Sequence, residues 1–389
     1  MIASARVPSG RFEPAARYDG PGADPTQRPE GPVISDSTQP ATVGELGEFA
    51  LIERMNSNRV QAAAVQLGPG DDAAVVAAPD GRFVVSTDML VQDRHFRLDW
   101  SSPVEIGRKA IAQNAADIVA MGAAPTAFVV ALGCPADTPV AFVDGLTDGM
   151  WDEAARAGGS IAGGDLVRNG QLVISVTAFG DLRGRAAITR SGARVGDTVA
   201  IAGRLGRSAA GLAVLSSGMD GRDEFAGVLA DHRAPRPRYA AVLDRFVESA
   251  TAATEVTPHA LTDVSDGLLA DLGHIADASG VAIDLDYAAL RDPALESIAA
   301  ALRSAAVPDP AGLSSAGPNA DAAQWILTGG EDHAFAGAFP ADRPLPPGWV
   351  AIGLVHAGHG VTVDGVARPG GGGWESFGGA DAASVGDPR

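Results

Sequence analysis

The chain has 389 residues, 46% of them hydrophobic, so it is long enough to bury the cores of two or three domains. No apolar run is long enough for a membrane-spanning helix, and we expect no membrane partner. The formal charge of −19 argues against a nucleic-acid partner, which would require a basic face. The N-terminus lacks the apolar core of a secretory signal, and one cysteine, Cys134, excludes an internal disulfide framework. These features predict a cytoplasmic protein.

The first part of the chain divides into a leader and an ordered region. Residues 1–43 are rich in Pro, Gly, Ser and Thr without periodicity, which predicts a disordered leader that catalysis does not need. Order should begin at residue 44, where apolar residues mark one helical face up to Met55. Two strand-like runs follow at 73–78 and 83–88, joined by the turn at 79–81.

The next elements complete a first domain over residues 44–189. A helix is predicted at 103–121, because Ser102 and Pro103 form a helix start and Gly122 a stop. A strand at 126–132, a helix at 139–157 and a strand at 172–180 follow.

A second domain is predicted over residues 190–379, with a tail at 380–389. Its predicted helices lie at 205–217, 236–253 and 267–279. Its predicted strands lie at 198–202, 260–264, 281–286, 333–339, 350–355 and 360–366. Strands and helices mix without strict alternation, which favours an α+β fold over a uniform parallel sheet.

Acidic and hydroxyl side chains recur at the ends of predicted strands or beside glycines. Each such cluster alone is weak evidence, since Asp is ordinary in turns and at helix starts. Several in one chain suit Mg²⁺, which prefers carboxylate and hydroxyl oxygens, and the glycines allow a phosphate to approach the backbone. The set comprises Asp72, Ser86, Thr87, Asp88, Asp117, Asp165, Asp263, Ser265, Asp266, Glu331 and Asp332.

Other sequence signals favour structural roles. The chain has no Walker loop, no protein-kinase motif and no H-E-x-x-H. The glycine-rich turn at 203–211 could cradle a phosphate, but without a matching acidic residue we interpret it as a tight turn and helix start. Cys134 ends an apolar strand and is interpreted as a packing residue. His95 is ambiguous from its spacing alone.

Seven ordered motifs carry a resemblance to a known family: GDDAAVV, STDMLVQDRHF, RKAIAQNAADIVAMGAAP, AGGDLVR, ITRSGARVGD, TDVSDGLLADLGHIA and TGGEDHAF. Together with the late GGGWESFGG, they resemble thiamine-monophosphate kinase, of the aminoimidazole ribonucleotide synthetase-like superfamily, over about residues 44–377. The resemblance implies a two-domain α+β fold in which the N-terminal sheets of two subunits pair in a homodimer. It also implies transfer of phosphate from ATP to thiamine monophosphate, with several Mg²⁺ ions.

The resemblance assigns roles to residues at matching motif positions. The implied metal ligands are Asp72, Ser86, Thr87, Asp88, Asp117, Asp165, Asp263 and Asp266. The implied ATP contacts are Gly164, Asp165, Arg190 and Ser265, and the implied thiamine-phosphate contacts are His95, Glu331 and Trp374. No catalytic side chain is required, because the phosphate acceptor is already ionised and catalysis rests on charge neutralisation and alignment.

Related enzymes provide alternatives. Selenophosphate synthetase would need a reactive Cys or selenocysteine near the N-terminus, and the hydrogenase-maturation relative would need a C-terminal cysteine. Aminoimidazole ribonucleotide synthetase remains the enzymatic alternative, disfavoured by STDMLVQDRHF. A catalytically silent ATP- or thiamine-phosphate-binding protein would have a broken ligand set, whereas all the expected oxygen ligands are present in this sequence.

Overall fold

The structure is a computed structural model that describes residues 42–69, 73–244, 256–305 and 321–367. The predicted leader to residue 41, the tail, Asp72 and Trp374 lie outside the described residues. Residues 40–389 group as one unit by their contacts. Within it, the connection between residues 181 and 198 joins a four-stranded sheet to a seven-stranded sheet. We propose that the boundary between two domains lies in this connection, near residue 190.

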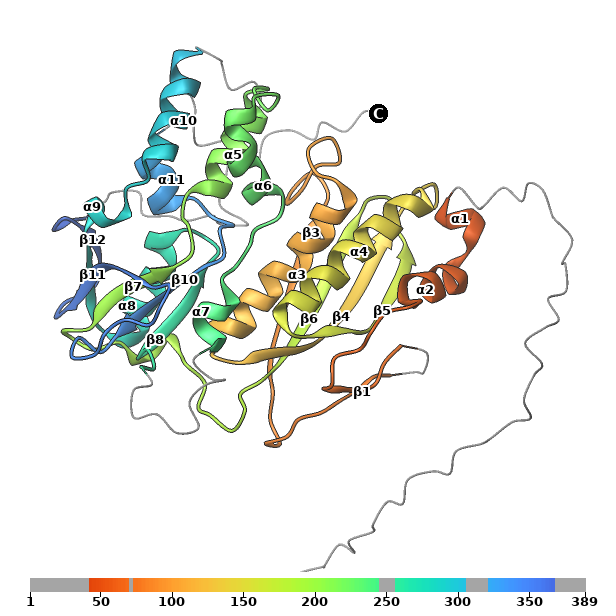
Figure 1. Cartoon of the computed structure of the whole chain (residues 1–389), viewed down its shortest axis with the longest axis horizontal. Coiled ribbons are helices and arrows are strands. Elements are labelled where there is room, and N and C mark those ends of the chain that lie inside the picture. Colours follow the sequence, from red (N-terminus) through yellow and green to blue (C-terminus); the bar gives the residue numbers. More distant parts are fainter. Residues whose placement is uncertain (1–41, 70–72, 245–255, 306–320, 368–389) are drawn as a thin grey trace, which may run out of the picture. The chain divides into compact units, whose positions relative to one another are not determined.

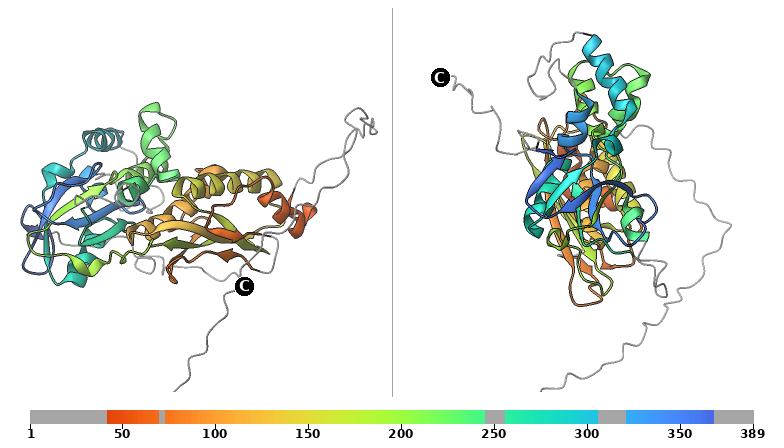
Figure 2. Two further views of the ribbon diagram at one scale, coloured as in Figure 1. Left: turned by 60° about the horizontal axis from the view of Figure 1, so that its bottom comes forward. Right: turned by 90° about the vertical axis from the view of Figure 1, so that its left-hand side faces the viewer.

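The N-terminal part is a four-stranded sheet with helices on one face (Figures 1 and 2). The sheet order is β3-β6-β4-β5, with β4 and β5 parallel and the other pairs antiparallel. The strands are β3 (Val84–Val91), β4 (Ala124–Cys134), β5 (Ser160–Arg168) and β6 (Val173–Asp181), and a short pair, β1 (Val65–Leu67) and β2 (Val75–Val76), lies before them. The helices are α1 (Val43–Leu46), α2 (Glu48–Asn56), α3 (Pro103–Ala120) and α4 (Val140–Ala157).

Local sequence sets the ends of the two long helices. At the start of α3, the Ser102 side chain accepts from the Glu105 backbone N–H while the Glu105 carboxylate accepts from the Ser102 N–H, which forms a capping box. Helix α4 ends at Gly158, whose φ of 94° is left-handed and favours glycine.

Two glycines allow α3 and α4 to pack against each other without side chains between their backbones. A Cβ added at Gly107 would lie 2.1 Å from the Leu146 carbonyl oxygen, and one at Gly149 would lie 2.1 Å from that of Val104. The close approach fixes the position of α3, which carries several site residues.

None of the helices that the structure describes covers the opposite face of this sheet (Figure 2). The β1–β2 pair packs near Ala127 and Ala162, but Phe83, Val85 and Met89 are each more than half exposed on the same face. Such an apolar patch on a sheet face is typical of an interaction surface.

The C-terminal part is a seven-stranded mixed sheet in the order β13-β12-β9-β11-β7-β10-β8. Its strands are β7 (Thr198–Ala202), β8 (Ala260–Val264), β9 (Ala282–Leu285), β10 (Ala334–Phe339), β11 (Val350–His356), β12 (Gly360–Val363) and β13 (Val366–Ala367). Its helices are η1 (Arg190–Gly192), α5 (Arg207–Ser216), η2 (Asp223–Phe225), α6 (Ala226–Arg233), α7 (Tyr239–Leu243), α8 (Leu268–Ser279), α9 (Tyr287–Leu290), α10 (Pro293–Ser304) and α11 (Ala322–Thr328).

The α+β prediction is confirmed, and several local predictions need correction. The run at 73–78 forms only the two-residue β2, which pairs with β1 and not with β3. Strand β5 was not predicted, because its glycines at 163 and 164 weaken a strand pattern. Helices α6, α10 and α11 were also missed. The helix predicted at 236–253 is represented by α7, and residues 245–255 lie outside the described residues.

Candidate functional site

Strand β3 and helix α3 bring the first group of predicted residues together. The Ser86 hydroxyl donates to the Asp117 carboxylate at 2.6 Å. The Asp88 backbone N–H donates to the buried Asn114 side-chain oxygen at 2.9 Å, which anchors the strand end to the helix. Ser86 and Asp88 alternate along β3 and therefore share the face that α3 covers.

The turn between β8 and α8 brings a second group from the C-terminal part. Asp263 is 3% exposed at the end of β8, and its carboxylate lies 3.1 Å from Nδ1 of the buried His333. Asp271 Oδ2 accepts from the backbone N–H groups of Asp266 and Gly267, which fixes the turn. The other oxygen of Asp271 is buried and has no hydrogen-bond partner among the residues that the structure describes.

The two groups of carboxylates interact electrostatically. Burial and the neighbouring Asp263 raise the pKa of Asp117 to about 7. Burial likewise raises the pKa of Asp88 and that of Asp266, with Asp263 contributing to both shifts. Burial opposes the charge on His333, but its hydrogen bond to Asp263 gives that histidine a raised pKa. These four carboxylates influence one another across the two sheets, and Asp88, Asp117, Asp263 and Asp266 are called the carboxylate cluster below.

This carboxylate cluster fits Mg²⁺ in its donor chemistry. Carboxylates and the Ser86 hydroxyl are hard oxygen donors, and burial together with the negative charge of Asp263 raises the pKa of Asp88 and that of Asp117. The unpartnered oxygen of Asp271 lies beside the same turn. Among the described residues, no three acidic, histidine or cysteine side chains are already arranged as a metal-binding group. The metal set therefore stays a prediction.

The Gly-Gly-Glu-Asp loop before β10 is held in a strained conformation. Glu331 and His333 both have left-handed backbones, with φ of 64° and 49°, which residues other than glycine adopt at a cost. The Glu331 N–H donates to the Ser265 carbonyl at 2.7 Å, and the His333 N–H donates to the Val264 carbonyl at 2.9 Å. These bonds attach the loop to the β8–α8 turn.

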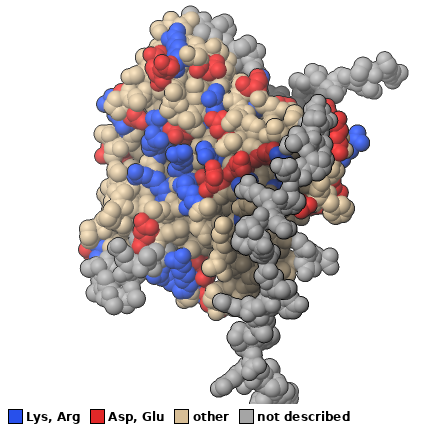
Figure 3. Space-filling view, turned by 45° about the vertical axis from the view of Figure 1, so that its right-hand side comes forward, with Lys and Arg blue, Asp and Glu red and all other residues tan. Residues whose placement is uncertain are grey.

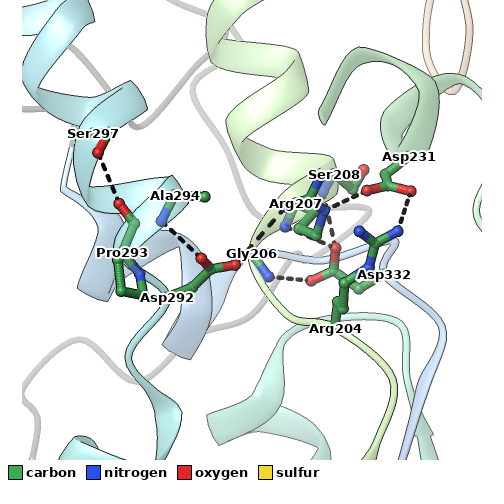
Figure 4. Close-up of polar contacts among 10 residues, drawn as sticks. All are labelled: Arg204, Gly206, Arg207, Ser208, Asp231, Asp292, Pro293, Ala294, Ser297 and Asp332. Carbon is green, nitrogen blue, oxygen red and sulfur yellow. Dashed lines mark hydrogen bonds and ion pairs between the residues drawn. The ribbon is translucent and has the colours of Figure 1, made fainter. Parts of the chain in front are cut away.

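Asp332 fixes the same loop to the start of α5 (Figure 4). Its carboxylate accepts hydrogen bonds from the backbone N–H groups of Gly206, Arg207 and Ser208. These are the donors that a bound phosphate would use at a helix N-terminus. The structure therefore confirms the turn-and-helix-start interpretation of residues 203–211, because α5 begins at Arg207 and the chain supplies its own acceptor there.

The predicted thiamine-phosphate contacts His95 and Glu331 both lie beside Lys109. The buried Lys109 ammonium lies 2.8 Å from Glu331 Oε1 and donates to the His95 carbonyl at 2.8 Å. Burial opposes ionisation of Glu331, but Lys109 with His232 lowers the pKa of its carboxyl to about 2. The Glu331 side chain remains 36% exposed, so it is not sealed from a ligand.

The tautomer of His95 follows from its hydrogen bonds. Its Nδ1 lies 3.0 Å from the Val91 backbone N–H, which can only donate, so Nδ1 accepts. Burial lowers the pKa of His95, and the Lys109 charge adds to this. The neutral ring therefore carries its proton on Nε2 and can offer a hydrogen bond to an anion.

Two predicted ligands lie on the other face of the sheet. The Thr87 hydroxyl donates to the Val176 carbonyl at 3.0 Å, away from Ser86 and Asp88. Asp165 lies across the sheet in the same row as Met89, because the register pairs Asp165 with Ala131, Ala131 with Ser175, and Ser175 with Met89. Thr87 and Asp165 therefore lie on the sheet face opposite Ser86 and Asp88, and their metal-binding role stays a prediction.

The predicted ATP contacts have mixed placements. Arg190 lies close enough to Asp266 to influence its pKa, and Ser265 supports Glu331 through its carbonyl. Gly164 has a structural requirement of its own, because a Cβ there would lie 1.9 Å from the Val130 carbonyl oxygen. The roles of these residues toward ATP remain predictions.

One face of the molecule carries charges of both signs. Figure 3 shows basic side chains gathered next to a row of acidic ones. Along α4, Asp144, Asp148 and Asp152 pair with Arg54, Arg59 and Arg108 respectively. Of the helices that the structure describes, none is long and apolar enough to cross a bilayer.

Comparison with known proteins gives the family. Residues 70–182 match the family model "AIR synthase related protein, N-terminal domain". The chain is 52% identical over 349 residues to the thiamine-monophosphate kinase of Mycobacterium tuberculosis (strain CDC 1551 / Oshkosh), covering 89% of this chain and 96% of that protein. The chain belongs to the thiamine-monophosphate kinase family.

Solved structures of the family have the same fold. The thiamine-monophosphate kinase of Stenotrophomonas maltophilia K279a is 31% identical, with a TM-score of 0.67 covering 82% of this chain and 98% of that one. A structure described as AaThiL complexed with AMPPCP and TMP is 28% identical, with a TM-score of 0.63 covering 87% of this chain and 99% of that one. Members of the thiamine-monophosphate kinase family thus share the arrangement described above.

Sequence reasoning missed the residues that support the site. Asn114, Lys109 and Asp271 lie inside quoted motifs, but one sequence gives no sign of which partner each will contact. Asp332 belongs to the predicted oxygen donors, but its contact with the start of α5 has no sequence signal of its own, and neither has the contact of His333 with Asp263. The double glycine before these residues marks a loop with special backbone geometry.

Proposed function

We propose that the chain transfers the γ-phosphoryl group of ATP to the phosphate of thiamine monophosphate, giving ADP and thiamine diphosphate. Membership of the kinase family supports this function, and a relative is described in complex with AMPPCP and TMP. The observation that carries the proposal is the convergence of Asp88 and Asp117 with Asp263 and Asp266 from the second sheet. Bare carboxylates would repel two phosphorylated substrates, so this cluster suits a metal-assisted transfer.

We assign the metal-binding role to the carboxylate cluster with Ser86, and keep Asp72, Thr87 and Asp165 as further candidates. Bound Mg²⁺ supplies positive charge that neutralises the phosphates. The protein's own contribution is to hold the oxygens in place: Asn114 fixes the end of β3, and Asp271 fixes the β8–α8 turn.

The site needs no protein nucleophile or strong base. A phosphate oxygen is already ionised near neutral pH, and His95 uses Nδ1 as an internal acceptor, so its role is to donate from Nε2. Cys134 is buried on β4 and its thiol has a raised pKa through burial, so it is a poor phosphoryl carrier. Transfer is therefore direct and in line.

The assembly and location complete the proposal. The exposed apolar side chains Phe83, Val85 and Met89 favour pairing of this sheet face with a second copy in a homodimer. The single cysteine, Cys134, leaves the chain without an internal disulfide, which supports a cytoplasmic location.

Incubation of the full chain with ATP, Mg²⁺ and a panel of acceptors tests the function. Thiamine diphosphate should form from thiamine monophosphate, while free thiamine should react poorly because it offers no phosphate. With ATP chiral at the γ-phosphorus, direct transfer should invert configuration. Retention would overturn the mechanism. Efficient phosphorylation of thiamine, or ADP release with cyclisation of formylglycinamidine ribonucleotide, would overturn the function.

A further inference from the structure

The chain uses lysine at one position. Its 29 basic residues are arginines except for Lys109. This residue lies in the middle of α3 and is 2% exposed, whereas lysine is almost never fully buried unless it is paired. A buried ammonium needs partners for its three N–H donors, and the contacts of Lys109 therefore indicate its purpose.

Those contacts join two segments that are far apart in the sequence. Lys109 Nζ donates to the carbonyl of His95, in the turn that follows β3. The same atom lies 2.8 Å from Oε1 of Glu331, in the loop that precedes β10. The turn belongs to the N-terminal part and the loop to the C-terminal part, so one ammonium ties the two parts together beside the site.

Lys109 also provides the positive charge that Glu331 requires. Nδ1 of His232 lies 4.0 Å from Glu331 Oε2, but burial lowers the pKa of His232 to about 4, so this ring is neutral near pH 7. The ring instead shares a hydrogen bond with the Ser208 hydroxyl at 3.1 Å. Glu331 has a left-handed backbone, and the ammonium helps to hold its side chain in that strained loop.

We propose that Lys109 is a positioning residue, which sets Glu331 and the His95 segment at a fixed separation for thiamine monophosphate. This inference rests on the proposed function of the site. Lys109 acts through these two segments and does not itself need to touch the substrate.

The shape of the side chain explains why an arginine does not serve at this position. An ammonium is compact and directs its three donors toward a carbonyl and a carboxylate at once. The planar guanidinium is larger, and in a space where Lys109 is 2% exposed it would displace one of the two segments. Lys109→Arg should therefore keep the charge and still fail to position the site.

Steady-state kinetics of three variants in the full chain provide the first test. Lys109→Met keeps the length and removes the charge, and it should raise KM for thiamine monophosphate roughly tenfold or more, as expected for loss of a charged hydrogen bond. KM for ATP should change little. Lys109→Arg should resemble Lys109→Met. The matched control, Arg108→Met, removes the neighbouring cation, which pairs with Asp152, and should leave both KM values unchanged.

A double variant separates positioning from general stability. In a Glu331→Gln background, Lys109→Met should add little further change to KM for thiamine monophosphate, because its principal partner has already lost its charge. An unchanged KM for thiamine monophosphate in folded Lys109→Met, or an equal rise in both KM values, would overturn the inference. A wild-type protein that does not phosphorylate thiamine monophosphate would overturn the proposed function and this inference with it.

The single lysine also allows a test without variants. Protein grown with ¹³Cε-labelled lysine should give one side-chain NMR signal. Thiamine monophosphate should shift this signal, and thiamine without phosphate should not. An unmoved signal at a saturating concentration of thiamine monophosphate would contradict a positioning role, even if Lys109→Met failed to fold.

Discussion

Asp332 is the residue through which the loop before β10 depends on a distant helix. Its carboxylate accepts from three N–H groups at the start of α5, while its neighbours Glu331 and His333 contact Lys109 and Asp263. One carboxylate therefore completes the hydrogen bonding of a helix and holds two site residues in place.

Asp332→Ala should destabilise the protein more than removal of an ordinary helix cap. Three backbone donors lose their acceptor, and leaving such groups unsatisfied costs about 1–3 kcal/mol each where they are buried. Asp321→Ala is the matched control, because Asp321 caps α11 through one N–H, that of Ala323, and a cap is worth about 1 kcal/mol. Chemical denaturation measures the free energy of unfolding of both variants. Equal losses would show that the contact of Asp332 with α5 contributes little.

Asp117→Asn should stabilise the metal-free protein at neutral and alkaline pH. The pKa of Asp117 is raised to about 7, so the folded state disfavours its ionised form. That cost is complete above pH 7 and disappears as the pH falls toward the ordinary carboxyl pKa. Thermal unfolding with a chelator should give the variant a higher Tm, by a few degrees, at pH 8 and nearly the same Tm as wild type at pH 4. A lower Tm at pH 8 would contradict the charge repulsion described here.

At the scale of elements, α3 carries Lys109, Asn114 and Asp117, and its position depends on how closely it packs against α4. Gly149→Ala should therefore be strongly destabilising, by more than the 1–3 kcal/mol typical of overpacking, because its Cβ would meet the Val104 carbonyl oxygen. Gly273→Ala in α8 is the control, since nothing lies within 4 Å of its added Cβ and alanine favours a helix. The denaturation midpoint should fall in Gly149→Ala and rise in Gly273→Ala. A tolerated Gly149→Ala would show that the helices can separate without loss.

How far the sequence predicted these elements depended on how local their determinants are. The bounds of α3 followed from Ser102 and Pro103, which act within one turn. Strand β5 was missed because its glycines fit a close neighbour, β4, that no local pattern reveals. In the site, Ser86 with Asp117 could be anticipated from their motifs. The face of the sheet that Asp165 occupies depends on the register of three successive strand pairs, and Glu331, the partner of Lys109, lies more than 200 positions away.

At the scale of the whole molecule, we predict that the helix-free face of the first sheet forms a dimer. Met89→Glu places a charge among the exposed apolar side chains of that face, so it should shift the protein toward monomers. Val195→Glu changes a similarly exposed apolar residue outside that sheet and should leave the assembly unchanged. Light scattering coupled to size-exclusion chromatography measures the mass. A monomeric wild type, or a dimer that persists in Met89→Glu, would contradict the prediction.

Strand β3 contributes to both the carboxylate cluster and the face predicted to form the dimer. Ser86 and Asp88 face α3, whereas Val85, Thr87 and Met89 face the other side of the sheet. Insertion or deletion of one residue before Ser86 would exchange the two sets, so that carboxylate and hydroxyl oxygens would face the apolar surface. A substitution affects one surface at a time, whereas a change in length affects both. A change of length inside β3 should therefore disrupt both surfaces, whereas a change of length in the turns on either side would leave the alternation of β3 intact.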